Sequence, residues 1–199
     1  MKPSAENLAT AAKAATKRGP APVHLWNPPF CGDLDMRIAR DGTWFYLGTP
    51  IGRPELVRLF SSILRKDDDD YFLVTPVEKV GITVDDAPFV AVDFDISGKP
   101  ENRFSGNVEN DDQVLTFETN VGDRVAAGPD HPIRVVRDAT TGEPSPYVLV
   151  RANLEALIDR KSFYRLVDIG CIGDVDGEDW FGLWSGGQFV AVIPAAELG

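Results

Sequence analysis

One four-letter run, FVAV, occurs twice in this sequence, at residues 89–92 and again at 189–192. Around each copy the chain repeats a similar order of short β-rich runs and amphipathic segments. Self-similarity of this kind is the mark of an internal repeat, and a repeat limits the possible folds more strongly than composition does. We therefore predict an internal duplication in which the same buried strand occurs once in each copy.

The first copy is predicted over residues 23–95. MRIARDGTWFYLG, residues 36–48, has the alternation of a β-hairpin, with a tight turn at Asp41-Gly42. Residues 53–66 carry apolar side chains at helical spacing, which predicts an amphipathic helix. Strands are expected at YFLVTPVE, KVGITVDD and PFVAVDF. The predicted order is therefore ββαβββ.

The second copy is predicted over residues 133–199. Its first two strands are expected at 133–138 and 146–151. NLEALIDRK, residues 153–161, has helical spacing of its leucines, and FYRLVDIG, residues 163–170, has the composition of a strand. DWFGLWSGG and QFVAVIP complete a second ββαβββ set.

The remaining residues form an arm and a connector. Residues 1–22 are expected to be an N-terminal arm, with a marginal helix at 4–17. Residues 96–132 begin with a loop rich in turn residues and continue with a hairpin that turns near Asn120-Val121-Gly122. The predicted fold class is α+β, with two tandem similar ββαβββ units, mostly antiparallel sheets, joined by this connector hairpin.

The net charge of the chain argues against some classes of binding partner. The formal net charge is −11 at pH 7. Such a surface repels phosphate backbones and anionic lipid, so neither nucleic acid nor a membrane is an expected partner. The sequence has no apolar run long enough to cross a bilayer and no secretory apolar region, so we expect a soluble, cytoplasmic protein.

The cysteines and acidic runs give no metal signature. Cys31 and Cys171 do not form a CxxC pair, and we expect both to be buried structural thiols. The run at 67–70 lacks the ligand spacing and glycine of a calcium-binding loop, so a solvated turn is the expected structure. GDVDGED, residues 173–179, fails the same test and is better explained as a hairpin turn. We expect no metal and no cofactor.

A few polar residues near predicted turns are candidates for ligand binding. A histidine at the start of a strand can act as an acid, a base or a ligand contact, or can simply hydrogen-bond the backbone of its turn. An arginine before a helix favours an anion nearby. The candidate ligand-binding residues are His131, Asn120, Thr119, Arg134, Arg53 and Glu78. For the threonine and asparagine, turn formation is the competing explanation.

Several long motifs resemble one bacterial family. They are, in chain order, CGDLDMRIARDGTWFYLGTPI, RPELVRLFSSILRK, YFLVTPVEKVGITVDDAPFVAVDF, FETNVGDRV and PDHPIRVVRD. The resemblance is to domain of unknown function 1285 and extends from Trp26 to Pro194. It differs at Val80, where an aromatic or similar residue is expected. The resemblance implies a bacterial, soluble α+β protein built of two similar halves, with a signalling-related role and no established ligand or reaction.

Three functional hypotheses follow. No catalytic or nucleotide-binding motif is present, so the first is a non-catalytic module that binds a small molecule or a protein. The alternative is a hydrolase-type enzyme that uses His131 with Asp130 or Cys31. The third is a structural subunit, including a homo-oligomer, that associates through an aromatic face containing Trp180 and Trp184, next to Phe181.

Overall fold

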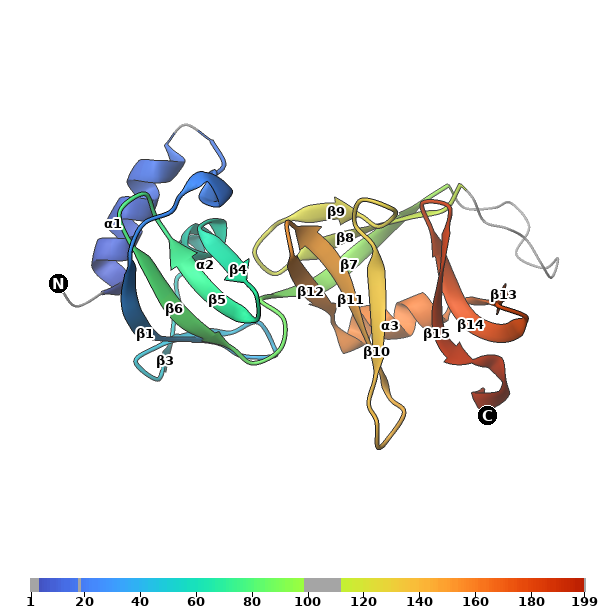
Figure 1. Cartoon of the computed structure of the whole chain (residues 1–199). Helices are drawn as coiled ribbons and strands as arrows, with labels where there is room; N and C mark the ends of the chain where they lie inside the picture. The colour runs from blue at the N-terminus through green and yellow to red at the C-terminus, as the bar shows by residue number, and fades with distance from the viewer. Residues whose placement is uncertain (1–3, 18, 99–111, 199) are drawn as a thin grey trace. The chain divides into compact units, whose positions relative to one another are not determined.

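The computed structural model describes residues 4–17, 19–98 and 112–198. The chain divides into two compact units, Met1–Pro88 and Phe89–Gly199. Each unit has its own buried apolar residues. No sheet is shared between the units among the described residues (Figure 1).

The first unit contains two α-helices and a six-stranded sheet among its described residues. The elements run in the order α1 (Ala5–Thr16), a 3-10 turn η1 (Val23–Leu25), β1 (Phe30–Ile38), β2 (Trp44–Tyr46), β3 (Thr49–Pro50), α2 (Pro54–Ser62), β4 (Leu64–Asp67), β5 (Asp70–Val74) and β6 (Lys79–Val84). The strand order in the sheet is β3-β2-β1-β6-β5-β4. The central pair, β1 and β6, is parallel, and the other pairs are antiparallel.

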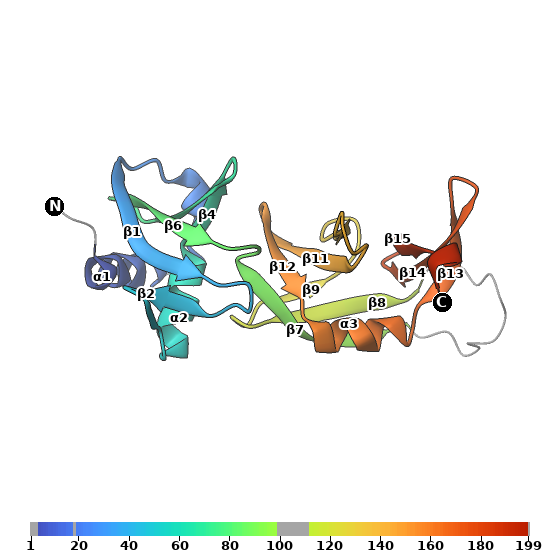
Figure 2. The same ribbon diagram turned by 90° about the horizontal axis from the view of Figure 1, so that it is seen from below.

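Both helices of this unit lie on one side of its sheet (Figure 2). On α2, Phe60 is fully buried and its ring stacks on that of Trp44. The N-terminal helix α1 docks on α2 through Leu8 and Ala12, which are also fully buried. The helix predicted at 4–17 is therefore confirmed, and its burial supplies the stability that its sequence alone lacks.

The second unit adds a smaller sheet to a six-stranded one. Its elements are β7 (Phe89–Ser97), β8 (Val114–Thr119), β9 (Arg124–Ala126), β10 (Ile133–Arg137), β11 (Pro144–Arg151), β12 (Leu154–Ile158), α3 (Arg160–Val167), β13 (Cys171–Val175), β14 (Glu178–Ser185), β15 (Gln188–Pro194) and a 3-10 turn η2 (Ala195–Glu197). The larger sheet has the order β10-β11-β12-β7-β8-β9, and β13-β14-β15 form the smaller one. Helix α3 packs on β7.

The two six-stranded sheets have the same topology. In each, two three-stranded meanders meet through a parallel pair made by the first and the last strand, β1 with β6 and β7 with β12. The first unit inserts α2 between its meanders, whereas the second places α3 after its last strand. The similarity between the halves therefore relates β1–β6 to β7–β12, and the exact ββαβββ pattern that we predicted is not confirmed.

The two FVAV runs, which suggested the duplication, occupy different kinds of position. The first run begins β7, which we expected to end the first unit but which pairs with β8 and β12 of the second unit. The other lies in β15 of the small sheet. Phe89 has no exposed surface, whereas Phe189 is half-buried. The tetrapeptide match is therefore not a structural equivalence.

Two secondary-structure predictions in the second unit were wrong. Residues 153–161 were expected to be helical, but 154–158 form β12, in which Leu154, Ala156 and Ile158 are buried in strict alternation. Residues 163–170 were expected to be a strand, but most of them lie in α3. The cap of that helix is Asp159, whose carboxylate accepts a hydrogen bond from the Ser162 amide at 2.7 Å.

A smaller difference affects the helix predicted at residues 53–66. It ends at Ser62 as α2, and its last residues form the edge strand β4. The apolar spacing that suggested one long helix continues into β4 because Leu64 is buried against the same core.

The predicted tight turns are confirmed. Gly42 has φ 83° between β1 and β2, and the Thr43 amide donates to Asp41 Oδ1 at 2.9 Å. Asp176 and Gly177 both have positive φ between β13 and β14, as a type I′ turn requires. The connector hairpin is β8–β9, and it belongs to the larger sheet of the second unit. Residues 99–111 of the predicted loop lie outside the described residues.

The α+β class, with mostly antiparallel sheets, is confirmed. Within the part of the chain that the structure describes, no helix combines the length and apolarity needed to span a bilayer.

Candidate functional site

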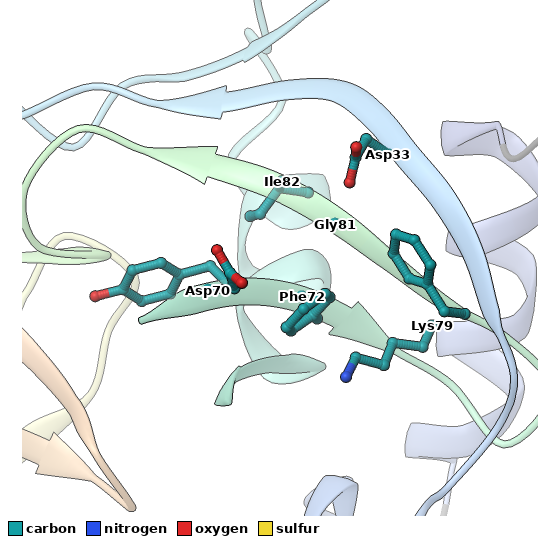
Figure 3. Close-up of a pocket in the computed structure, with 8 residues that line it drawn as sticks. Asp33, Asp70, Phe72, Lys79, Gly81 and Ile82 are labelled. Carbon is teal, nitrogen blue, oxygen red and sulfur yellow. The ribbon is translucent and has the colours of Figure 1, made fainter. Parts of the chain in front are cut away.

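The first unit carries a pocket on its sheet. Its volume is about 400 Å³, and its lining comes from β1, β5 and β6. The lining residues are Phe30, Asp33, Asp70, Tyr71, Phe72, Lys79, Gly81 and Ile82. Figure 3 shows Asp33 and Asp70 on opposite sides of β6, with Lys79 beside Phe72.

Strand register brings these residues to one face. Phe72 of β5 and Asp33 of β1 both pair with Gly81 on β6. Directly paired residues in a sheet point to the same side. Because side chains alternate along a strand, Leu34, Leu73 and Val80 point to the opposite face, and all three are buried. Asp33, Phe72 and Lys79, together with Asp70 two residues before Phe72, are therefore left on the open face.

Gly81 forms the floor of the pocket. A Cβ atom at this position would overlap Asp33 Oδ1 and would lie 3.7 Å from the Phe30 ring. The missing side chain is what lets the Asp33 carboxylate lie across β6. An isolated glycine within a strand commonly marks such a close approach.

The aromatic wall is an edge-to-face pair. The rings of Phe30 and Phe72 are 6.1 Å apart with an interplanar angle of 88°. Phe30 is 56% exposed, which is unusual for a phenylalanine in a strand. The ammonium of Lys79 lies 3.8 Å from the centroid of Phe72 and makes a cation–π contact.

The positive charge of Lys79 is already compensated. Its Nζ donates to Asp67 Oδ2 at 2.7 Å, and Arg65 donates to the same oxygen at 2.8 Å. Burial tends to raise the pKa of Asp67, but the hydrogen bonds from Arg65 and Lys79 outweigh it and hold that pKa below its usual value. The Asp67 carboxylate is therefore ionised and stays between two cations.

The negative charges of Asp33 and Asp70 are not compensated. Within the described part of the chain, neither carboxylate has a hydrogen-bond or ion-pair partner. The pocket thus combines two free carboxylates, an aromatic pair and one neutralised lysine. Its chemistry suits a cation with some apolar surface.

A metal centre is not indicated at this position. Over residues 4–17, 19–98 and 112–198, no three histidine, cysteine or acidic side chains lie close enough to hold a metal ion.

The residues predicted from the sequence do not line this pocket. Four of them lie in the second unit, and backbone groups engage three of these side chains. His131 Nδ1 is 2.9 Å from the Leu149 carbonyl oxygen. Thr119 Oγ1 accepts from the Asp123 amide, and Asn120 Oδ1 accepts from the Val90 amide at 3.1 Å.

The other three predicted residues lie at three separate positions in the fold. The guanidinium of Arg134 pairs with Glu155 and lies over the Tyr147 ring. In the first unit, Glu78 closes the β5–β6 turn through backbone bonds with Thr75. Arg53 precedes α2 and lines a separate groove beside α1. The structure therefore does not gather the predicted residues into one site.

The cysteines differ from expectation. Cys31 was expected to be buried but is exposed, at the start of β1, where Phe30 is exposed as well. Cys171 is half-buried, and burial raises the pKa of its thiol, against a smaller lowering by a hydrogen bond with Trp184. A raised thiol pKa disfavours the reactive thiolate.

The acidic run at 67–70 contains a turn, as predicted, but the turn joins β4 to β5 instead of following a helix, and two residues of the run matter to the pocket. Asp67 neutralises Lys79, and Asp70 lines the pocket itself. The aromatic residues Trp180, Phe181 and Trp184 are half-buried in β14, and the Trp184 ring lies 5.5 Å from that of Phe189.

Sequence reasoning missed Phe30, Asp33, Phe72 and Gly81. One signal was present: Gly81 interrupts an otherwise β-branched run, KVGITV. The parallel pairing of β1 with β6, which places Asp33 over that glycine, has no local sequence signal.

Two family models match the chain. "Domain of unknown function (DUF1285), N-terminal domain" matches residues 21–87, and "Protein of unknown function (DUF1285), C-terminal domain" matches residues 88–192. The chain belongs to the DUF1285 family. The resemblance stated from the sequence motifs is thereby confirmed, and the boundary between the family's two domains falls next to the boundary between the compact units.

Solved DUF1285 structures resemble this chain. A DUF1285 family protein from Silicibacter pomeroyi DSS-3 is 60% identical, with a TM-score of 0.82, and the match covers 96% of this chain and 97% of that one. A DUF1285 family protein from Shewanella baltica OS155 is 30% identical, covers 68% of this chain and 92% of its own, and has a TM-score of 0.49. No curated protein matches the chain.

Proposed function

We propose that this DUF1285 protein is a non-catalytic ligand-binding module whose N-terminal unit binds a small organic cation, an amine or a guanidinium compound. The pocket between β1, β5 and β6 is the binding site. The proposal includes the cytoplasmic, signalling-related role expected from the sequence, in which the bound state would be read by a partner protein.

One observation carries this proposal. Two carboxylates without partners, Asp33 and Asp70, converge on a pocket that already holds an aromatic pair. An ammonium or guanidinium group placed there would make charge-assisted hydrogen bonds to the carboxylates. Its apolar part would contact Phe30, whose ring is exposed without a ligand.

The charge balance of the open face disfavours an anion. Lys79 is the cation that lines the pocket, and its ammonium is held by Asp67 and covers Phe72. An anionic ligand would have to displace Asp67 and would face Asp33 and Asp70 as well. The volume of about 400 Å³ lies within the range of small-molecule sites.

The hydrolase alternative has no comparable support. His131 Nδ1 is occupied by the Leu149 carbonyl, and Asp130 is exposed. Cys31 lies in the other compact unit, and its thiol contacts the Pro29 carbonyl at 3.5 Å. We therefore propose binding without chemistry.

The test uses three probes with one ring and different charge. Benzylamine, benzyl alcohol and benzoate are titrated into the full chain by calorimetry, and we expect binding in that order. Asp33→Asn and Asp70→Asn should each weaken benzylamine by about tenfold, since a hydrogen bond to a charged group contributes about 1.5–3 kcal/mol.

Asp35→Asn is the matched control. This residue is exposed on the same strand but does not line the pocket, so its replacement should leave benzylamine affinity unchanged. Equal affinity for benzylamine and benzoate, or wild-type affinity in both pocket variants, would refute the proposed cation site.

A further inference from the structure

The first unit has a second cavity, formed by its helices. A groove of about 650 Å³ runs between α1, α2 and the segment from β3 to the start of α2. It shares no lining residue with the pocket between β1, β5 and β6. Any ligand of the groove is therefore independent of the function proposed above.

Small side chains on α1 keep this groove open. Ala5 and Ala9 are one helical turn apart and both line it. Leu8 and Ala12, on the neighbouring face of α1, are buried and hold the helix on the body of the unit. The alanine methyls thus leave a space beside a helix that is firmly docked.

The inner wall of the groove is apolar. It is formed by Phe60 and Leu56 of α2, by Ile51, and by the ring of Tyr46. Phe60 is fully buried beneath it, while the other three are half-buried. Such a wall favours a ligand with a hydrocarbon body, because each buried methylene contributes about 0.8 kcal/mol.

Two cationic side chains lie on the lining of the same groove. Arg53 precedes Pro54 at the start of α2, and Lys13 comes from the last turn of α1. Both side chains are exposed, and within the described residues neither has a hydrogen-bond or ion-pair partner. One carboxylate, Glu6, also lines the groove, so the cations outnumber it.

We propose that this groove binds a single-chain amphipathic carboxylate. Its hydrocarbon tail would lie along Phe60, Leu56 and Ile51. Its carboxylate would pair with Arg53, whose planar guanidinium can hold both oxygens, and with Lys13. The N-terminal end of α2 adds a favourable partial positive charge near the same head group.

Charge complementarity decides against the other single-chain amphiphiles. An amine could pair only with Glu6 and would be repelled by Arg53 and Lys13, and an alcohol would leave the excess positive charge of the lining uncompensated. A carboxylate neutralises that excess charge while its tail covers the apolar wall. The head group is therefore the part of the ligand that distinguishes this groove from a general hydrophobic surface.

The experiment compares three ten-carbon ligands on the full chain. Decanoate, decanol and decylamine are titrated below their aggregation limits, and binding is measured by calorimetry. We expect decanoate to bind at least about tenfold more tightly than either of the others, as one ion-paired head group predicts. Vesicles of phosphatidylglycerol form a separate arm, in which we expect no binding.

Two kinds of variant test the two parts of the site. The double variant Arg53→Gln with Lys13→Gln should remove the preference for decanoate, whereas Arg58→Gln should keep it. Arg58 is exposed on the same helix but does not line the groove. Ala9→Trp fills the groove and should abolish binding of all three ligands.

The possible results of these titrations either support the proposal or overturn it. Equal affinity for the three ligands, a decanoate preference that survives the double variant, or binding to vesicles without binding to free decanoate would each overturn the proposal. If Ala9→Trp fails to fold, the double variant decides alone, because both of its side chains are exposed. Loss of benzylamine binding in Asp33→Asn has no bearing on this result, so the two sites succeed or fail separately.

Discussion

Gly81 is the residue on which the proposed cation site depends most directly. In Gly81→Ala, the new methyl would occupy the place of the Asp33 carboxylate, which would turn toward solvent. We expect benzylamine affinity to fall about as far as in Asp33→Asn. The melting temperature should stay level or rise slightly, because alanine is favoured over glycine within a strand by roughly 0.5–1 kcal/mol.

The control for this change is Gly52→Ala. A Cβ atom at Gly52 meets no neighbour, so the change should not destabilise the protein and should leave benzylamine binding unaltered. Unchanged affinity in Gly81→Ala, measured by the same calorimetry, would mean that the position of the Asp33 carboxylate does not matter.

Asp67 makes the stability of the first unit dependent on pH. Its pKa in the folded protein lies below the usual carboxyl value because Arg65 and Lys79 hydrogen-bond the ionised form. The stabilisation is therefore complete above the unfolded pKa, near 3.9, and is lost as the pH falls through the lower folded value. We expect Asp67→Asn to cost about 1–2 kcal/mol at neutral pH, with allowance for the partial exposure of this carboxylate.

Urea unfolding at a series of pH values measures this contribution. The difference between the wild type and Asp67→Asn should begin to shrink below about pH 4, where the carboxylate becomes protonated in the unfolded state, and should disappear once the pH is also below the lower folded pKa. A difference that stays constant down to pH 2 would contradict the ionic origin of the effect.

At the scale of elements, α1 is held by tertiary contacts. Leu8 has no exposed surface, and its replacement by alanine is expected to cost about 2–4 kcal/mol or to detach the helix. Thermal unfolding and limited proteolysis measure the two outcomes. Because α1 lines the groove, decanoate binding should weaken together with its docking.

Asn7→Ala is the control on the same helix. Asn7 is exposed, and only its backbone amide takes part in the cap at Ser4. Equal stability of Leu8→Ala and Asn7→Ala would show that α1 does not depend on its buried face.

For the whole molecule, the division into two units predicts independent folding. The boundary at Pro88–Phe89 separates two hydrogen-bonded sheets, and the family models change at the neighbouring residue. We expect a fragment of residues 1–88 to unfold cooperatively on heating and to keep benzylamine affinity. A fragment without a cooperative transition would mean that the first unit needs the rest of the chain.

The sequence predicted the tight turns of this fold correctly but mispredicted some of its helices and strands. Local signals succeeded where one or two residues set the geometry, as at Asp41-Gly42 and Asp176-Gly177, whose turn conformations need residues that tolerate positive φ. Residues 153–161 were mispredicted because a short apolar run fits both helical and strand periods. Its central place between β11 and β7 makes it a strand, and that place is a non-local property.

The two candidate sites also differ in how far the sequence indicated their residues. Arg53 was predicted as a ligand-binding residue because a cation before a helix favours an anion, and in the structure it lines the groove beside α1. The cation pocket was not predicted, because Phe30, Phe72 and Lys79 meet only through strands that are distant in sequence.

The sequence by itself determined the α+β class, the family and the tight turns. These features depend on residue types and short spacings, which the chain carries without folding. The tertiary structure alone decided how the halves correspond and which strands lie at the centre of each sheet. It also decided that Asp33 lies over Gly81, because strand pairing across many residues selects the register, and the register selects which side chains meet.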